Sequence, residues 1–221
     1  MFNDKYKFFS YICLDKRKDK TLTYMKRILS IVCIAATAWL LTACGSVIQL
    51  PRNGMNGGIK TYTFYNLPET LQDLQSLPEA NLKDPYGVAA LTIAALCRYE
   101  TNPDACFEML NWLKGPDGLS NYEKQFIRER LQGKTYKPRS FFQGATPANS
   151  YAPTQPYKLT PVSNPYSFQE SGWATIYLRS GGADSERPIK LRQKASTGEW
   201  YLNDIQCLSD IRTPANEDPW K

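Results

Sequence analysis

Apolar residues follow a helical spacing between residues 84 and 132 and alternate with polar residues after residue 172. Val88–Cys97 is apolar on every side, which is typical of a helix buried at the centre of a protein. At about ten residues it is too short to span a bilayer. Two further helices are each predicted to bury one face. Their apolar stripes consist of Cys106, Met109, Leu110 and Leu113 in the first, and of Tyr122, Phe126, Ile127 and Leu131 in the second.

Capping residues predict where these helices begin. Asp84-Pro85 and Asn102-Pro103 each place a good N-cap side chain before a proline at the first helical position. Ser120–Glu123 has the form of a capping box. A shorter helix is predicted over Pro68–Leu77, with the proline in its first turn.

Strands are predicted before and after the helices. Thr61–Tyr65 has strand composition, and Tyr157–Val162 is expected as an edge strand because it contains a proline. Trp173–Ser180, Ile189–Arg192 and Trp200–Gln206 follow, with an alternating pattern in the first two. The segment 136–165 interleaves prolines with aromatic residues, so we expect an extended stretch whose rings pack into the protein.

Helices followed by antiparallel strands predict an α+β fold, with N-terminal helical hairpins packed on a C-terminal antiparallel sheet. We expect a single domain over residues 60–212 and a C-terminal tail over residues 213–221. The order of helices and then strands also resembles that of NTF2-like folds, whose cone often holds a small ligand. That resemblance rests on analogy of fold alone.

The region before residue 60 has the pattern of an export signal. Met25-Lys26-Arg27 is basic, Ile28–Leu40 is apolar and uncharged, and Leu41–Gly45 ends the segment. The last segment, Leu-Thr-Ala-Cys-Gly, resembles the lipobox of bacterial lipoproteins. This resemblance implies cleavage before Cys44 and acylation of its thiol and amine, with palmitate among the usual chains. The alternative is an uncleaved N-terminal anchor helix.

The resemblance to a lipoprotein divides the chain further. Residues 25–43 are the expected signal peptide, and residues 44–59 are a glycine-containing flexible tether. Residues 1–24 are polar and place the signal unusually far from the start, so we expect translation to begin at Met25 and this stretch to be an upstream extension. The protein is then expected at an outer membrane or cell surface, bound through its lipid.

Charge argues against nucleic acid as a partner. The chain has 27 basic and 21 acidic residues, of which eight and three lie in residues 1–43, so 19 and 18 remain from Cys44 onward. This part is nearly neutral, whereas nucleic-acid binding requires a concentrated basic surface. The expected partners are the membrane, through the lipid anchor, and an envelope protein or small ligand.

Three cysteines follow the lipidation site: Cys97, Cys106 and Cys207. Export favours disulfides. Cys97 and Cys106 lie on either side of the turn between two helices, where facing positions can come close enough to bond. We expect this pair to form a disulfide. The alternative is that all three are buried free thiols.

The chain contains no histidine. This excludes Ser-His-Asp and Cys-His catalysis and histidine-ligated zinc, and no cofactor motif is present. We therefore expect no cofactor, no metal and no catalytic residue. The alternative is a hydrolase that uses carboxylates, for which the paired acids Glu100 with Asp104, Asp184 with Glu186, and Glu217 with Asp218 are the candidates.

One group of residues indicates a ligand-binding surface. Lys190, Arg192 and Lys194 alternate onto one face of a predicted strand. The predicted strand before it presents Trp173, Tyr177 and Arg179, so the two could form a basic face with aromatic rings for an anionic or sugar ligand. The alternative is the ordinary polar, solvent-facing side of an antiparallel sheet.

Several segments resemble a bacterial domain family of unknown function. They are Leu119–Leu131, Pro138–Pro147, Ala183-Asp184-Ser185 and Glu217-Asp218-Pro219-Trp220, and the resemblance covers roughly residues 65–221. The family implies no activity and no site. The leading hypothesis is a lipid-anchored envelope protein with a non-catalytic domain that binds a ligand or partner. A carboxylate hydrolase and a purely structural envelope component are the alternatives.

Overall fold

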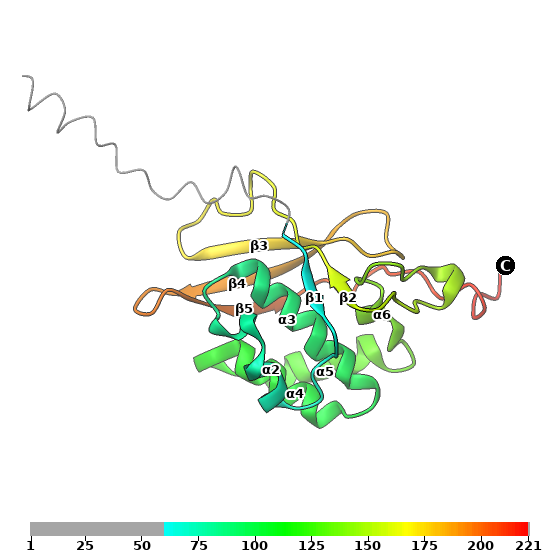
Figure 1. Cartoon of the computed structure of the whole chain (residues 1–221), viewed down its shortest axis with the longest axis horizontal. Coiled ribbons are helices and arrows are strands. Elements are labelled where there is room, and N and C mark those ends of the chain that lie inside the picture. The colour runs from blue at the N-terminus through cyan, green and yellow to red at the C-terminus, as the bar shows by residue number, and fades with distance from the viewer. Residues whose placement is uncertain (1–59, 221) are drawn as a thin grey trace, which may run out of the picture. The chain divides into compact units, whose positions relative to one another are not determined.

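The computed structural model describes residues 60–220 (Figure 1). These residues fall in one compact unit. The expected upstream extension (1–24), signal peptide (25–43), tether (44–59) and lipidation site Cys44 lie outside the described residues and stay predictions. No helix within the described range has the length and apolar character needed to cross a membrane.

The described elements confirm the predicted order of helices followed by strands. The helices are α2 (Leu71–Ser76), α3 (Pro85–Cys97), α4 (Pro103–Lys114), α5 (Asn121–Leu131) and α6 (Tyr136–Arg139). Short 3-10 turns occupy Pro78–Asn81, Arg98–Glu100, Gly115–Asp117 and Pro147–Asn149. The strands are β1 (Tyr62–Phe64), β2 (Tyr157–Leu159), β3 (Trp173–Leu178), β4 (Arg187–Lys194) and β5 (Glu199–Ile205).

Helix α3 is buried on all sides because its sequence is apolar all the way round. Asp84 caps its N-terminus and Pro85 occupies its first position. Every residue from 87 to 96 is buried. Thr92 is the polar side chain in this run, and its hydroxyl donates a hydrogen bond of 2.8 Å to the carbonyl of Val88. The predicted central helix is confirmed.

The caps of α4 and α5 are also confirmed. The side chain of Asn102 accepts a hydrogen bond from the N–H of Ala105 at 3.1 Å. Ser120 Oγ accepts from the N–H of Glu123 at 3.2 Å, and Glu123 Oε2 accepts from the N–H of Ser120 at 2.9 Å, which completes the capping box.

Helix α2 begins later than predicted. Thr70 is its N-cap and forms a capping box with Asp73, whose carboxylate accepts from the N–H groups of Thr70 and Glu69 at 3.0 and 3.2 Å. This side-chain pair satisfies the free N–H groups at the helix start. Pro68 therefore precedes the helix, and the predicted boundary was wrong by about one turn.

The C-terminal strands form an antiparallel sheet in the order β3-β4-β5, which confirms the α+β fold (Figure 1). The inward residues Ala174, Ile176 and Leu178 of β3 are buried, as their alternation predicts. Strand β2 pairs with β1, and the predicted edge strand Tyr157–Val162 meets the three-stranded sheet at Val162, which bridges to Tyr177 of β3. The resemblance to NTF2-like folds stays a prediction.

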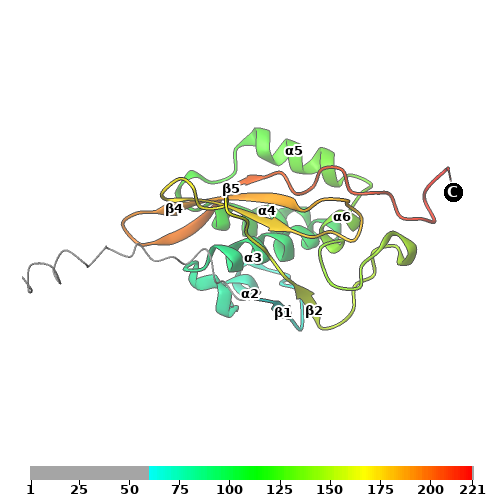
Figure 2. The same ribbon diagram turned by 90° about the horizontal axis from the view of Figure 1, so that it is seen from above.

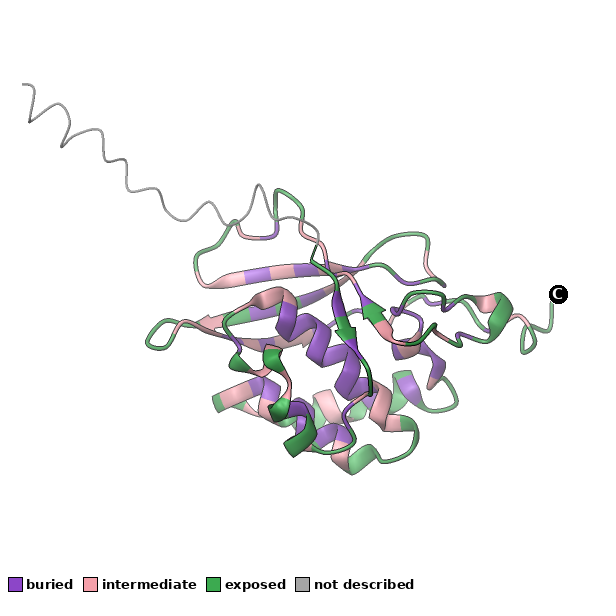
Figure 3. Cartoon of the chain, viewed as in Figure 1, coloured by how far each residue is buried: buried purple, intermediate pink, exposed green. Residues whose placement is uncertain are grey.

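The sheet and the other helices cover α3 from different directions. Figures 1 and 3 show α3 between the three-stranded sheet and the layer that contains α4. Seen from above, α5 and the β1–β2 ladder lie on opposite sides of α3 (Figure 2). One face of the sheet is used to bury α3, which leaves its other face outward.

The proline-rich segment packs into the protein through its aromatic rings, as expected. Tyr136 and Tyr151 stack with ring centroids 5.2 Å apart, and Phe142 meets Phe64 of β1 edge to face at 6.3 Å. The segment is less extended than predicted, because it contains α6 and a 3-10 turn before β2.

The expected Cys97–Cys106 disulfide does not form, and Cys97, Cys106 and Cys207 are all free thiols. Arg98–Glu100 continues α3 as a 3-10 turn. Cys97 is the last residue of α3 beside this turn, while Cys106 is buried within α4. Burial raises the pKa of Cys106 to about 12 and also raises the pKa of Cys97. Both thiols are therefore protonated at neutral pH.

We predict that Tyr62→Phe will lower the free energy of unfolding by about 1–2 kcal/mol at pH 7. The Tyr62 hydroxyl donates to Asp84 Oδ2 at 2.5 Å and links β1 to the start of α3. Burial raises the pKa of Asp84, but hydrogen bonds from Lys60 and Tyr62 outweigh it and hold this pKa below its usual value. The stability that ionised Asp84 contributes is therefore complete above the pKa of Asp84 in the unfolded chain. This stability is lost as pH falls through the lower pKa of Asp84 in the folded protein.

Urea unfolding at pH 7 and below pH 3 (roughly one unit under the ordinary Asp pKa) checks this prediction. Tyr65→Phe is the matched control, since Tyr65 is 80% exposed. The prediction is contradicted if Tyr62→Phe and Tyr65→Phe lose equal stability. It is also contradicted if the loss in Tyr62→Phe is no smaller in acid than at pH 7.

Candidate functional site

The outward face of the three-stranded sheet carries most of the predicted ligand-binding residues. Trp173 of β3 pairs with Arg192 of β4, and Thr175 pairs with Lys190. Directly opposite residues on paired strands point to the same face, and the residues between them are buried. The structure thus brings Trp173, Lys190 and Arg192 together.

Arg192 lies over the ring of Trp173, with its guanidinium carbon 5.3 Å from the ring centroid. This is a cation–π distance. Trp173 is half-buried and Arg192 is exposed. The ring therefore orients the guanidinium while leaving its N–H groups available to a ligand.

Tyr177 and Arg179 do not join this group. Tyr177 lies on the same face as Trp173 but pairs with Pro188, four residue pairs further along the sheet. On the side away from β4, the backbone N–H and carbonyl of Tyr177 form two hydrogen bonds with the backbone of Val162, of 2.9 and 2.8 Å. Arg179 lies beyond the last residue of β3. Trp173, Lys190 and Arg192 are therefore the residues of the predicted ligand face that lie together.

A β-bulge in β5 adds a residue that the sequence did not reveal. The pairing passes from Lys190 with Asp204 to Leu191 with Leu202, so Asn203 is the extra residue. Asn203 is half-buried. A bulge shifts the alternation of side chains by one, and no local motif in this strand marks where the shift occurs.

Buried Lys114 ties the end of α4 to this bulge. Its ammonium donates to Glu123 Oε1 at 2.6 Å and to the carbonyl oxygen of Asn203 at 2.9 Å. Burial acts to raise the pKa of Glu123, but hydrogen bonds from Lys114 and Ser120 outweigh it and hold this pKa below its ordinary value. Glu123 is therefore ionised at neutral pH.

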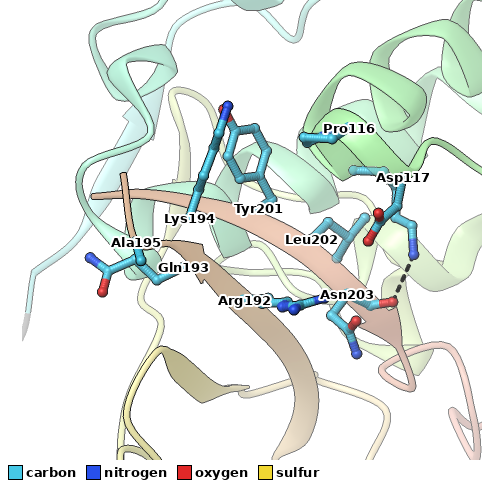
Figure 4. A pocket seen from close by; sticks show the side chains of 10 residues that line it. Pro116, Asp117, Arg192, Gln193, Lys194, Ala195, Tyr201, Leu202 and Asn203 are labelled. Atoms are coloured by element: carbon cyan, nitrogen blue, oxygen red, sulfur yellow. Dashed lines mark hydrogen bonds between the residues drawn. The ribbon is translucent and has the colours of Figure 1, made fainter. Parts of the chain in front are cut away.

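A pocket of about 300 Å³ lies between the β4–β5 hairpin and the turn after α4 (Figure 4). The dashed line in Figure 4 ends at the carbonyl oxygen of Asn203, which accepts the hydrogen bond from the Lys114 ammonium. The pocket is lined by Lys114, Pro116, Asp117, Arg192, Gln193, Lys194, Ala195, Tyr201, Leu202 and Asn203.

A second depression of about 380 Å³ lies on the β3 side of the same face. Trp173 and Lys190 line it together with residues of the loop before β3, among them Tyr166 and Glu170. Asn203 lines both depressions. The two hollows therefore meet at the bulge residue, on either side of the Arg192–Trp173 pair.

The cations of this face are unpaired. Lys190, Arg192 and Lys194 take part in no ion pair within residues 60–220. Their neighbours on β5 use their carboxylates elsewhere: Asp204 accepts from Gln206 Nε2 at 2.6 Å, and Glu199 accepts from the Tyr201 hydroxyl at 2.9 Å. Asp204 and Glu199 keep their negative charge opposite Lys190 and Lys194, whereas Arg192 lies opposite Tyr201. Arg192 is therefore the cation of this face that can best offer its charge to an anionic group.

Two of the six acids considered for hydrolysis form ion pairs with arginines. Glu100 binds Arg139 with a closest distance of 2.7 Å, and Asp184 pairs with Arg212. In the described part of the chain, no three His, Cys, Asp or Glu side chains are placed to hold a metal ion.

Comparison with known proteins identifies the domain. A family model described as a domain of unknown function (DUF6935) matches residues 66–215. The chain belongs to the DUF6935 family. No curated protein and no solved structure matches it. The DUF6935 match contains both depressions and every residue of the outward sheet face.

We predict that Lys114→Met will destabilise the DUF6935 domain by about 1–3 kcal/mol at pH 7, because it leaves Glu123 and the Asn203 carbonyl without their shared donor. Because the pKa of Glu123 is lowered in the folded state, the ionic part of this loss is present above the unfolded-state pKa of Glu and fades as pH falls through the folded-state value.

Urea unfolding as a function of pH measures this effect. Lys190→Met removes an exposed, unpaired lysine of the same sheet region and should change stability by less than about 0.5 kcal/mol. Equal stability of the two variants would show that Lys114 does not anchor β5.

Proposed function

We propose that this protein is an exported lipoprotein, held at a membrane surface by acyl chains on Cys44. Its DUF6935 domain is a non-catalytic module that binds an anionic ligand on the outward face of the three-stranded sheet. The unpaired Arg192, stacked on Trp173 and flanked by Lys190, is the observation that carries the binding role.

The sequence before the domain supports the anchor. A basic segment, a short apolar core and Leu-Thr-Ala-Cys follow one another in the order that lipoprotein signals require. Two or more acyl chains anchor a protein stably, whereas one is marginal. The glycine-containing stretch 44–59 would then let the domain reach ligands near the membrane.

The chemistry of the sheet face supports an anion. A guanidinium can donate two parallel hydrogen bonds to a carboxylate or phosphate, and stacking on Trp173 holds this guanidinium in place. Lys190 supplies a second charge to the same face. The lack of any histidine in the chain supports binding rather than catalysis as the role of this surface.

We predict that Cys44→Ser will abolish lipidation. In a bacterial host supplied with an alkyne-tagged palmitate, the wild-type chain should be labelled and partition into the detergent phase, whereas the variant should be unlabelled. Cys33→Ser is the matched control, because Cys33 lies in the expected signal peptide and should leave labelling unchanged. Equal labelling of the wild type and Cys44→Ser would refute the anchor.

We predict that the double variant Lys190→Ala/Arg192→Ala will lose anion binding. Titration of glucuronate and of inorganic phosphate into the full-length protein in detergent, followed by tryptophan fluorescence, measures the affinity. The variant should bind at least about tenfold more weakly, since charge-assisted hydrogen bonds contribute about 1.5–3 kcal/mol each.

Lys134→Ala/Lys158→Ala is the control for net charge, because both lysines are exposed and lie away from the sheet face. Binding by the wild type should also weaken as salt concentration rises. Loss of affinity in both double variants alike would mean that overall charge, and not this face, attracts the anion.

A further inference from the structure

The largest of the described depressions lies beyond the edge strand β5, next to the anion-binding face. It has a volume of about 710 Å³ and lies among α2, the 3-10 turn after it, α4 and β5. A hollow of this size is in the range of small-molecule sites. We call it the edge cleft, and nothing in the sequence marked it as a site.

The edge cleft adjoins the pocket beside Arg192. Pro116 and Tyr201 line both hollows. Tyr201 also pairs directly with Arg192 across β4 and β5, so the anion site and the wall of the cleft are nearest neighbours on the sheet. Gly115 permits this arrangement, because it has a φ of +63° and a Cβ there would overlap the Tyr201 ring.

The walls of the edge cleft combine aromatic rings with hydrogen-bond acceptors. Trp112 and Tyr201 are half-buried rings. Glu108 is exposed and has no hydrogen-bond or ion-pair partner among the described residues, so both of its oxygens can accept hydrogen bonds.

Glu199 is the second acid of the cleft. Hydrogen bonds from Thr197 and Tyr201 lower its pKa, so it is ionised at neutral pH. Lys83 Nζ lies 4.0 Å from its Oε1 and offsets part of its charge.

We propose that the edge cleft and the pocket beside Arg192 form one groove, and that its ligand is an oligosaccharide. The anionic unit of this ligand lies at Arg192, and its neutral units lie between Trp112 and Tyr201. The inference rests on the proposed anion-binding function and names the class of its ligand.

Charge decides which part of the ligand enters the cleft. A second anionic unit would be repelled by Glu108 and Glu199. A cation is favoured less than the two acids suggest, because Lys83 already lies beside Glu199. Neutral sugar units fit the edge cleft better than anionic or cationic groups. Their hydroxyls donate hydrogen bonds to the carboxylates, and their apolar faces pack on the aromatic rings.

The test compares three probes on the full-length protein in detergent micelles: glucuronate, a trisaccharide of one glucuronate and two glucose units, and the trisaccharide of three glucose units. The wild type should bind the acidic trisaccharide at least about tenfold more tightly than glucuronate. It should bind the neutral trisaccharide more weakly than the acidic one, because that probe lacks the group that Arg192 holds.

Variants test whether the tighter binding of the acidic trisaccharide depends on residues of the groove. Trp112→Ala and Glu108→Ala should each reduce the preference for the acidic trisaccharide over glucuronate by about threefold or more, while binding of glucuronate itself stays unchanged. Arg192→Ala should weaken both acidic probes. Trp220→Ala is the matched control for loss of a tryptophan, since Trp220 is 94% exposed. Glu108 is an exposed side chain, so its variant keeps the test valid even if Trp112→Ala fails to fold.

The outcomes separate this inference from the proposed function. If glucuronate binds in an Arg192-dependent way but the acidic trisaccharide binds no more tightly, the groove is not one site and the inference fails alone. If no anionic probe binds, both proposals fail. Tighter binding of an Asp-Lys-Lys tripeptide than of the acidic trisaccharide, with the same dependence on Trp112, would overturn the sugar assignment.

Discussion

The complete burial of α3 is the constraint on which the rest of this structure depends. A helix with no polar face is stable in water only if other elements cover every side of it. Here the three-stranded sheet covers one side, α4 another, and α6 and the turn after α2 contribute further contacts. The aromatic residues of the proline-rich segment, with Phe64 of β1, complete the core around it.

This arrangement decides where a binding surface can form. The sheet uses one face to cover α3, so its outward face is free to carry charge and exposed aromatic rings. At the β5 edge, Lys114 holds the end of α4 against the bulge at Asn203. Lys114 and Asn203 line the pocket beside Arg192, and the adjacent Gly115, Pro116 and Tyr201 line the edge cleft. The packing that stabilises the core therefore also shapes the proposed groove.

Much of the fold was predictable because its signals are local. Asp84-Pro85, Asn102-Pro103 and Ser120–Glu123 each satisfy backbone N–H groups a few residues away, so their effect does not depend on the rest of the chain. Alternation along β3 likewise predicted which side would be buried. The start of α2 was missed because Thr70 and Asp73 compete with the proline signal at Pro68.

The sequence by itself determined the core helix, the order of elements, the lack of histidine chemistry and three residues of the sheet face. Only the tertiary structure decided the register that places Tyr201 beside Arg192, the bulge that inserts Asn203, and the contact of Lys114 with β5, 89 residues further along the chain. It also left Cys97 and Cys106 as separate thiols. Such features depend on how distant segments meet, and a periodic pattern records only which side of each segment is buried.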